Sequence, residues 1–246
     1  MTLPQDEPIN RGQSPVYPRF IRAYYSNSHC QESWIKIRPW LIFLPTVYLV
    51  VEGIRMTSFL PRPEPLTHDF LQELKRTTEA RWSSQSIDPE LYGFQFQQGT
   101  RWNAGLTDQK IEEYENSLRH RFPRDFKVFL GAMNGTDLPT LNVYGDSGFP
   151  AQQSIGVYSY PRDIDVIRQR IAEVGENRDE LSTTLAEQGF NLPGDAGLVP
   201  IYGHRYVMCS SDPDSSVVLS IADPTDAVVY GSSLREYLEN EFLDRG

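Results

Sequence analysis

GLTDQKIEEYENSLRHRFPRDFKVFLGAMNG, residues 105–135, is the stretch that decides the fold of this chain. Thr107 is a good N-cap, and the apolar residues after it recur at spacings of three and four, which places them on one helical face. They are Ile111, Tyr114 and Leu118. Phe122-Pro123 ends this helix, because a proline disfavours helical dihedral angles in the residue before it. The pattern predicts a first helix that stops at a tight proline corner.

A second helix is predicted directly after the corner, over residues 124–133. Four apolar residues share one of its faces and should be buried: Phe126, Phe129, Leu130 and Met133. Asn134-Gly135 would then end the helix with a left-handed C-cap, a conformation that glycine adopts without strain. This stretch alone therefore predicts two antiparallel helices.

The remaining elements are predicted in separate blocks around this pair. A helix capped by Thr67 precedes it, with an apolar stripe formed by Phe70, Leu71, Leu74, Thr78 and Trp82. Residues 83–101 are polar and rich in Gly and Gln, so we expect a loop with three possible apolar anchors, Tyr92, Phe94 and Phe96. Strands are predicted at 140–144, 154–158, 198–202, 206–209, 217–221 and 227–230. Helices are predicted from 163, over 177–188, and after Gly231. This order predicts an α+β fold with an antiparallel or mixed sheet.

The chain divides near Met56 into two parts of opposite charge. Residues 1–55 carry six Lys and Arg against four Asp and Glu, whereas residues 56–246 carry 17 against 29. The first part is rich in Pro and has no sustained period, so we predict a disordered or poorly ordered extension over 1–55. A Pro-rich linker over 56–66 and a single domain over 67–246 follow. Two interpretations stay open: Met56 is the native start of translation, or the upstream residues are a genuine tail.

Composition excludes several classes of protein. Hydrophobic residues make up 39% of the 246, with 12 Phe, 4 Trp and 13 Tyr, which is enough apolar surface for a folded core. The net charge of −10 disfavours a nucleic-acid partner, because a polyanion would be repelled. The longest apolar run, residues 40–51, is shorter than the about 20 residues that span a bilayer, so no membrane span is predicted. Cys30 and Cys209 fit free thiols, and we expect a cytoplasmic protein.

Patterns that would carry catalysis or metal binding are weak. GDSG, residues 145–148, resembles the nucleophile loop of trypsin-like proteases, and chain order allows a triad with His29 and Asp125. The helical period between these residues does not suit that fold, and the motif consists of turn residues. His204 and Cys209 lie five residues apart, an odd spacing that places them on opposite faces of a strand. We therefore predict no catalytic residue, no metal site and no bound cofactor.

Acidic residues gather in two loops that flank the strand predicted at 217–221. Asp212, Asp214, Asp223 and Asp226 are the candidate partner-binding residues, as an acidic rim that would attract a basic partner. The alternative is ordinary turn chemistry, since Asp-Pro occurs in both loops. A second acidic face on the first central helix, expected to be solvated, is formed by Glu112, Glu113 and Glu115. His120, just after that helix, is also expected to be solvated.

Four stretches of this sequence, taken together and in their order along the chain, form a pattern that is more specific than any one of them. They are Trp102 with the helix pair, GLVPIYGHRYVMC at 197–209, VVLSI at 217–221 and DAVVYGSSLREYLENEFL at 226–243. The set resembles the SUKH superfamily, which includes fungal cell-wall regulators and bacterial immunity proteins that neutralise polymorphic toxins. The resemblance covers about residues 100–243. The insert at 159–194 is longer and more helical than a minimal member would have.

The resemblance implies helices packed on one face of a mostly antiparallel curved sheet, and no shared catalytic residue. Trp102 would pack over the first helix, and Gly203 and Gly231 would allow sharp turns at strand ends. The positions that match the family read as structural: Trp102, Phe122, Pro123, Phe126, Gly135, Tyr202, Gly203, His204 and Gly231.

The function that the resemblance implies is non-enzymatic protein binding. An immunity-type protein would bind a cognate toxin and cover its active surface, and the net charge of −10 suits a basic nuclease-type toxin. The alternative is a scaffold or regulatory module that binds signalling or cell-wall-assembly proteins. A third hypothesis is a hydrolase that uses Ser147 of the GDSG loop. The sequence does not indicate an oligomeric state.

Overall fold

The structure is a computed structural model that describes residues 64–145 and 149–243. Contacts between Cα atoms separate the chain into two units with a boundary between Thr57 and Ser58, and every described residue belongs to the second. The predicted extension over 1–55, most of the predicted linker over 56–66 and residues 146–148 of the GDSG loop lie outside the described residues. The predictions made for them stay predictions.

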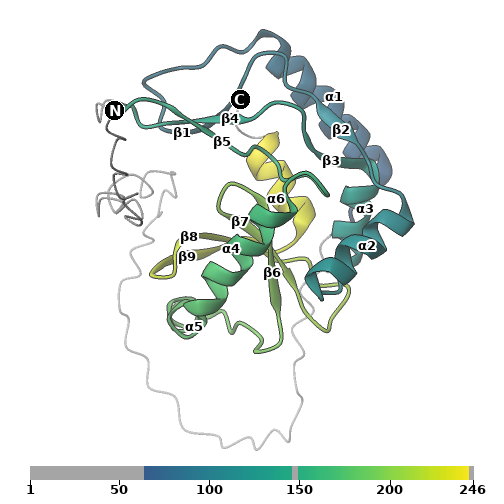
Figure 1. Cartoon of the computed structure of the whole chain (residues 1–246), viewed down its shortest axis with the longest axis vertical. Coiled ribbons are helices and arrows are strands. Elements are labelled where there is room, and N and C mark those ends of the chain that lie inside the picture. Colours follow the sequence, from purple (N-terminus) through teal and green to yellow (C-terminus); the bar gives the residue numbers. More distant parts are fainter. Residues whose placement is uncertain (1–63, 146–148, 244–246) are drawn as a thin grey trace, which may run out of the picture. The chain divides into compact units, whose positions relative to one another are not determined.

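The second unit combines helices with antiparallel sheets, as Figure 1 shows. In chain order the elements are α1 (His68–Ser84), β1 (Gly93–Phe96), β2 (Trp102–Ala104), α2 (Asp108–Leu118), α3 (Arg124–Ala132), β3 (Met133–Thr136), β4 (Thr140–Val143), β5 (Gln152–Ser154), α4 (Ile164–Glu176), α5 (Arg178–Glu187), β6 (Gly197–Tyr202), β7 (Arg205–Cys209), β8 (Val218–Asp223), β9 (Asp226–Gly231) and α6 (Leu234–Phe242). The predicted α+β class is confirmed.

The largest sheet has four strands in the order β6–β7–β8–β9, so each strand pairs with its neighbour in the sequence. Val199 lies opposite Val207, which lies opposite Val218, and these three valines form a buried row across the sheet. Gly203, with φ of +52°, makes the turn between β6 and β7. The late strands predicted from the sequence are confirmed to within one or two residues at most ends.

Both faces of this sheet are covered by helices, whereas the sequence predicted helices on one face. Alternate residues of a strand point to opposite faces. On one face, Val199, Val207 and Cys209 join a core cluster with α2, α3 and α6. On the other face, Leu198, Tyr206 and Met208 join a second cluster with Val174 of α4 and with Leu181 and Leu185 of α5. The insert at 159–194 supplies this second layer, so it completes the core.

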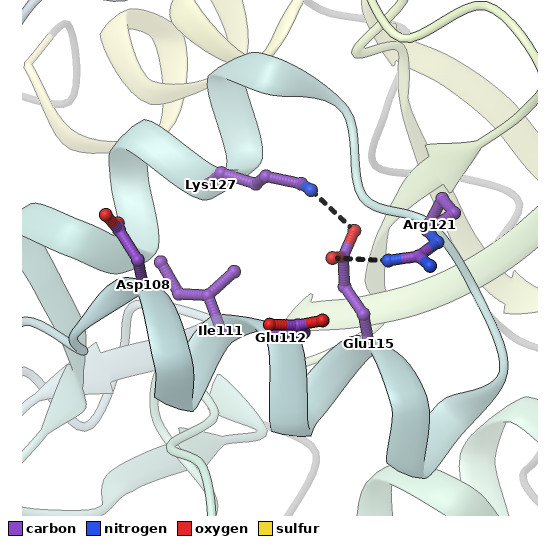
Figure 2. A pocket seen from close by; sticks show the side chains of 6 residues that line it. All are labelled: Asp108, Ile111, Glu112, Glu115, Arg121 and Lys127. Carbon is purple, nitrogen blue, oxygen red and sulfur yellow. Dashed lines mark hydrogen bonds and ion pairs between the residues drawn. The ribbon is translucent and has the colours of Figure 1, made fainter.

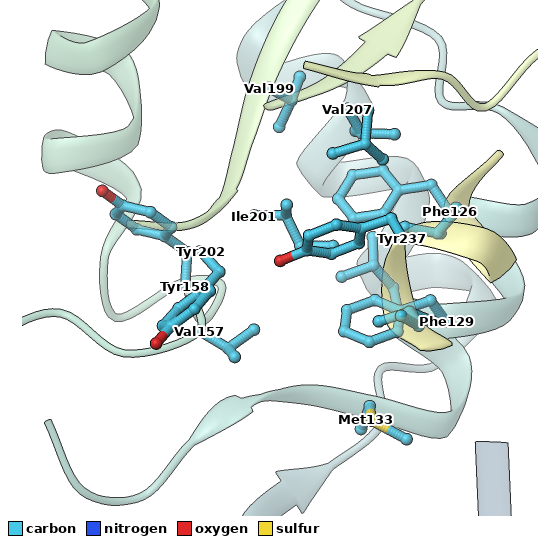
Figure 3. Close-up of a cluster of buried hydrophobic side chains, with 14 of the residues drawn as sticks. Phe126, Phe129, Met133, Val157, Tyr158, Val199, Ile201, Tyr202, Val207 and Tyr237 are labelled. Carbon is cyan, nitrogen blue, oxygen red and sulfur yellow. The ribbon is translucent and has the colours of Figure 1, made fainter. Parts of the chain in front are cut away.

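The larger core cluster ties the central helices to the sheet (Figure 3). Phe126 and Phe129 of α3 and Tyr237 of α6 are each at most 2% exposed. Figure 3 shows them beside the sheet residues Val199, Ile201 and Val207. Full burial of one such side chain stabilises a fold by about 1.5–3 kcal/mol before conformational entropy is subtracted. The face of α3 that was predicted to be buried is therefore the contact between the helices and the sheet.

The predicted starts of α1, α2 and α6 are held by side-chain caps. Thr67 accepts a hydrogen bond from the backbone N–H of Phe70, and Thr107 accepts one from Lys110. Ser233 caps α6 in the same way. Each cap satisfies an N–H group that the first helical turn leaves without a partner. The caps fix where these helices begin and hence how their apolar stripes face the core.

The helix α3 ends earlier than predicted, and Asn134-Gly135 is not its cap. It stops at Ala132, and Met133 already has extended dihedral angles as the first residue of β3, which pairs with β2. Gly135 does have a positive φ of 73°, but within β3. The Asn134 amide donates to the carbonyl oxygen of Tyr160 at 2.6 Å and accepts from its N–H at 2.9 Å. Strand pairing therefore overrides the capping signal.

The three-stranded sheet contradicts the loop predicted over residues 83–101. Figure 1 shows β4 between β1 and β5, and β1 pairs with β4 from Gly93–Val143 to Phe96–Thr140. Phe96 is buried and Phe94 is half-buried, as anchors should be, but Tyr92 is 55% exposed. The strand predicted at 154–158 is also displaced, because β5 covers Gln152–Ser154.

Candidate functional site

A hollow of about 320 Å³ lies between α2 and α3, beside the proline corner (Figure 2). It is lined by Asp108, Ile111, Glu112, Glu115, Arg121 and Lys127. All but one of these side chains are ionisable. This is therefore a place where the fold could concentrate reactive or binding groups.

Glu115 is the central group of this hollow, and its carboxylate is 3% exposed. Oε1 accepts a hydrogen bond from the backbone N–H of Phe122 at 2.6 Å and lies 2.8 Å from Nζ of Lys127. Oε2 lies 3.4 Å from Nη1 of Arg121 (Figure 2). The expectation that Glu115 belongs to a solvated face is therefore wrong. The side chain turns inward because it supplies the acceptor that the N–H of Phe122 needs at the corner.

The arrangement in this hollow stabilises the corner. Both oxygens of Glu115 are engaged, and the two cations that contact them are 40% exposed for Lys127 and 75% exposed for Arg121. The exposed carboxylates of Asp108 and Glu112 complete the rim. The hollow thus contains both positive and negative side chains around the carboxylate of Glu115. This carboxylate already binds the backbone N–H of Phe122 and contacts Lys127 and Arg121. Sequence reasoning missed this group, because only the turn at the corner brings Arg121 and Lys127 back to Glu115.

A second hollow, of about 290 Å³, lies at the start of α6. It is lined by Glu64, Ser232, Ser233, Arg235, Glu236 and Glu239. Arg235 contacts Glu64 at 3.1 Å and Glu239 at 3.1 Å, while Glu236 accepts a hydrogen bond from the N–H of Ser232. Three carboxylates therefore surround one cation, and the surface here is acidic.

The four candidate aspartates do not form one site. Asp212 and Asp214 lie in the loop before β8, whereas Asp223 ends β8 and Asp226 begins β9, so the two pairs sit at opposite ends of β8. Asp214 contacts Arg124 at 2.9 Å. Hydrogen bonds from the hydroxyl and the N–H of Thr225 lower the pKa of Asp223. The bonds from Thr225 to Asp223 are the turn chemistry that was the alternative for these residues, whereas the Asp214–Arg124 ion pair joins the loop to α3. All four aspartates are exposed.

The positions that match the SUKH pattern lie mostly in the core. Trp102 donates its ring N–H to the hydroxyl of Thr78 in α1 at 2.8 Å and lies against Phe129 and Phe242. Phe122 and Phe126 pack against each other at the corner with ring centroids 5.0 Å apart and ring planes tilted by 59°. Trp102 therefore packs on α1, α3 and α6.

Gly231 differs from its expected role as a turn residue. It has no positive φ, and a Cβ atom there would lie 3.0 Å from the backbone N of Tyr237 and 3.0 Å from the carbonyl oxygen of Ser233. Glycine at this position lets α6 approach the end of β9 closely. Gly203 does have the positive φ expected of it, and its Cβ position lies 2.9 Å from the ring of Phe94.

Two of the three described histidines, His120 and His204, lie against other side chains or the backbone, whereas His68 at the start of α1 is exposed. His204 follows Gly203 in the turn and lies 5.8 Å from the ring of Phe94. His120 is not solvated as expected: its ring lies against Gly197, where an added Cβ atom would be 2.5 Å from Nδ1. Partial burial, helped by the charge of Arg178, lowers the pKa of His120. The imidazole of His120 is therefore held in its neutral form more strongly than a free one.

Of the three side chains in the hypothetical hydrolase triad, Asp125 alone belongs to the described residues. The carboxylate of Asp125 accepts hydrogen bonds from the N–H of Leu66 at 3.3 Å and from the hydroxyl of Ser216 at 3.1 Å. His29 and Ser147, the other members of the hypothetical triad, lie outside the described residues. Cys209 is buried, and its burial, with the charge of Glu115 nearby, raises its pKa to about 12. This thiol is therefore protonated at neutral pH.

Among residues 64–145 and 149–243, no group of three or more His, Cys, Asp or Glu side chains is arranged to hold a metal ion. No helix in the same residues combines the length and the apolar character that a membrane crossing requires.

Comparisons of this chain with family models, with curated proteins and with solved structures found no match. The resemblance to the SUKH superfamily therefore stays a prediction.

Proposed function

We propose that this chain is a non-enzymatic protein-binding domain of the immunity type, which binds a basic toxin in the cytoplasm and neutralises it by covering its active surface. The observation that carries the proposal is the distribution of charge over the folded unit. The resemblance of the sequence to SUKH immunity proteins supports the same function but does not carry it.

The net negative charge of the folded unit is concentrated in residues 171–243. Residues 171–243 contain thirteen Asp and Glu but only three Lys and Arg. One of the three, Arg205, is buried against Glu241, which is itself buried. The exposed carboxylates of α5, the loops around β8 and the start of α6 therefore outnumber the cations around them, although Asp214 pairs with Arg124 and Glu239 with Arg235. The four candidate aspartates are part of this surface, although they do not form a site by themselves.

Such a surface suits a basic partner for a general reason. A nuclease binds phosphates, so its active site is cationic, and an acidic inhibitor is drawn toward it before contact. Charges act over about 10 Å at an ionic strength of 0.1 M, so several exposed carboxylates act together. Salt should therefore slow association more than it speeds dissociation.

Neutralising part of this surface tests the proposal. Glu180→Gln, Glu187→Gln and Asp226→Asn together remove three exposed charges from α5 and the start of β9. A matched variant removes three exposed charges elsewhere, through Asp69→Asn, Asp108→Asn and Glu112→Gln. Each protein is co-expressed with basic toxins encoded beside its gene, and association rates are measured at low and high salt.

We expect protection by the wild type, and an association rate at low salt that falls about tenfold or more in the first triple variant and less in the matched one. Absence of both binding and protection would contradict the proposal. Salt-sensitive binding to a signalling or cell-wall-assembly protein, without protection, would instead favour the scaffold function.

A further inference from the structure

An aromatic patch, formed by Tyr92, Tyr144 and Phe149 with the neighbouring Leu91, lies at one end of the three-stranded sheet. Leu91, Tyr92 and Phe149 are exposed, and Tyr144 is half-buried. The geometry points to this aromatic patch as the docking site for an arginine-bearing segment of a partner protein. The inference rests on the proposed function only in taking the partner to be a basic protein. It names a contact surface that is separate from the acidic surface of residues 171–243.

Two stretches that are distant in sequence, residues 91–92 and 144–149, bring these side chains together. Gly93 pairs with Val143 at the end of β1 and β4, so Tyr92 and Tyr144 lie just beyond the same pair. The ring centroids of Tyr92 and Tyr144 are 6.2 Å apart, and those of Tyr144 and Phe149 are 6.1 Å apart, both edge-to-face. Leu91 is 60% exposed, Tyr92 55% and Phe149 59%. A contiguous group of exposed large apolar side chains is typical of an interaction surface.

The aromatic patch is held in place by partly buried hydrogen bonds. The amide of Gln95, which is 5% exposed, donates to the carbonyl oxygens of Asp88 at 2.7 Å and Leu91 at 2.6 Å. It also accepts from the N–H of Asp88 at 2.8 Å. On the neighbouring strand, the amide of Asn142 donates to the hydroxyl of Tyr144 at 3.1 Å. The turn that carries Leu91 and Tyr92 is therefore preorganised, which lowers the entropy lost on binding.

The charges around the aromatic patch favour a cationic partner. Segments 85–98, 138–145 and 149–159, which contain the three strands of this sheet, have no Lys or Arg. They do contain Asp88 and Glu90, both exposed. The carbonyl oxygen of Glu90 lies 3.3 Å from the Cβ position of Gly145, so this turn is close to the end of β4. A cation that approaches the rings therefore meets carboxylates and no like charge from these segments.

Arginine fits this combination better than the other occupants of aromatic surfaces do. Its guanidinium stacks on the faces of Tyr and Phe rings and pairs with carboxylates. Bases of single-stranded nucleic acid also stack on such rings, but their binding requires a basic groove, and the carboxylates here would repel the phosphates. An exposed cation–π contact changes an equilibrium constant by about two- to fivefold per ring.

The test uses the full chain and an acetylated, fluorescently labelled deca-arginine peptide. Binding is measured by fluorescence anisotropy at two salt concentrations, and the contact is mapped by NMR of the ¹⁵N-labelled chain. The variant Tyr92→Leu with Phe149→Leu keeps apolar side chains but removes two rings. Glu90→Gln removes one carboxylate of the rim, and Val128→Ala with Val166→Ala, at exposed helix positions, is the matched control.

We expect the double ring variant to raise the Kd about 4- to 25-fold, Glu90→Gln to raise it about twofold at low salt, and the control to leave it within twofold. Shift changes should centre on residues 88–93 and 142–144. Unchanged affinity in the ring variant, with its circular dichroism spectrum intact, would overturn the inference. Tighter binding of a decathymidine oligonucleotide than of the peptide would also overturn it.

The test separates this inference from the proposed function. Peptide binding that is lost in the triple variant of Glu180, Glu187 and Asp226 but kept in the ring variant refutes the aromatic patch alone. Ring-dependent peptide binding without protection against any toxin refutes the immunity function alone.

Discussion

Replacing Glu115 with alanine should lower the free energy of unfolding by about 2–5 kcal/mol. The change leaves the buried N–H of Phe122, 2.6 Å from the carboxylate in the wild type, without its acceptor, which costs about 1–3 kcal/mol. The methylene lost from a buried position adds about 0.8 kcal/mol. The contacts with Lys127 and Arg121 add less than about 1 kcal/mol, because both cations are partly in water.

The measurement is urea unfolding of the full chain, followed by circular dichroism. Glu112→Gln is the matched control, because Glu112 lines the same hollow on the same helix but is exposed, and its free energy should change by less than about 0.5 kcal/mol. Glu115→Gln keeps one oxygen for the N–H and should fall between the two. If Glu115→Ala were as stable as the control, the carboxylate would not be what holds the corner.

Three further predictions concern buried ionisable groups. Arg205 and Glu241 lie 3.4 Å apart, and their side chains are 6% and 3% exposed. Either Arg205→Met or Glu241→Leu alone should lower the free energy of unfolding by about 3–5 kcal/mol. The double variant should regain most of this free energy, as measured by urea unfolding in a double-mutant cycle. Partial burial lowers the pKa of His120, so its neutral ring stabilises the fold above pH 6.5. This contribution to the free energy of unfolding is lost as the pH falls below 6.5. The variant His120→Gln should therefore show a smaller decline in the free energy of unfolding between pH 7 and pH 5. Burial raises the pKa of Cys209 to about 12. In a Cys30→Ser variant, where Cys209 is the single thiol, the native protein should react with a thiol reagent at pH 8 more than about 100-fold slower than the unfolded protein. Equal rates would refute the burial of this thiol.

The elements that the sequence predicted correctly are those whose signal is local. Thr107 caps α2 by its own hydroxyl, and the stripe of α6 is readable because Leu234, Tyr237 and Leu238 recur at helical spacing. The strands β6 to β9 follow one another in the sequence, with two-residue turns between β6 and β7 and between β8 and β9, so neighbours in sequence are neighbours in the sheet. Such patterns need no knowledge of distant residues.

The elements that were missed depend on partners far along the chain. β1 contains Gly and Gln and resembles a loop, yet β4, more than 40 residues later, pairs with it. Asn134-Gly135 carries a capping signal, but β2 recruits it into a strand. Glu115 and the neighbouring glutamates look alike in sequence, and only the corner distinguishes the buried one. Whether a segment forms a strand depends on partners that are distant in sequence, so the hydrophobic periodicity of the segment itself cannot predict it.

The two surfaces proposed for binding should control different rate constants, and this links them to one mechanism. Carboxylates of α5 and the β8–β9 turn act through space before contact, so their removal should lower the association rate with the deca-arginine peptide. Tyr92 and Phe149 act only when rings and guanidinium touch, so their loss should raise the dissociation rate. Surface plasmon resonance measures both rates for each variant. If salt and the ring variant changed the same rate constant, one electrostatic surface would account for binding, and the aromatic patch would have no part of its own.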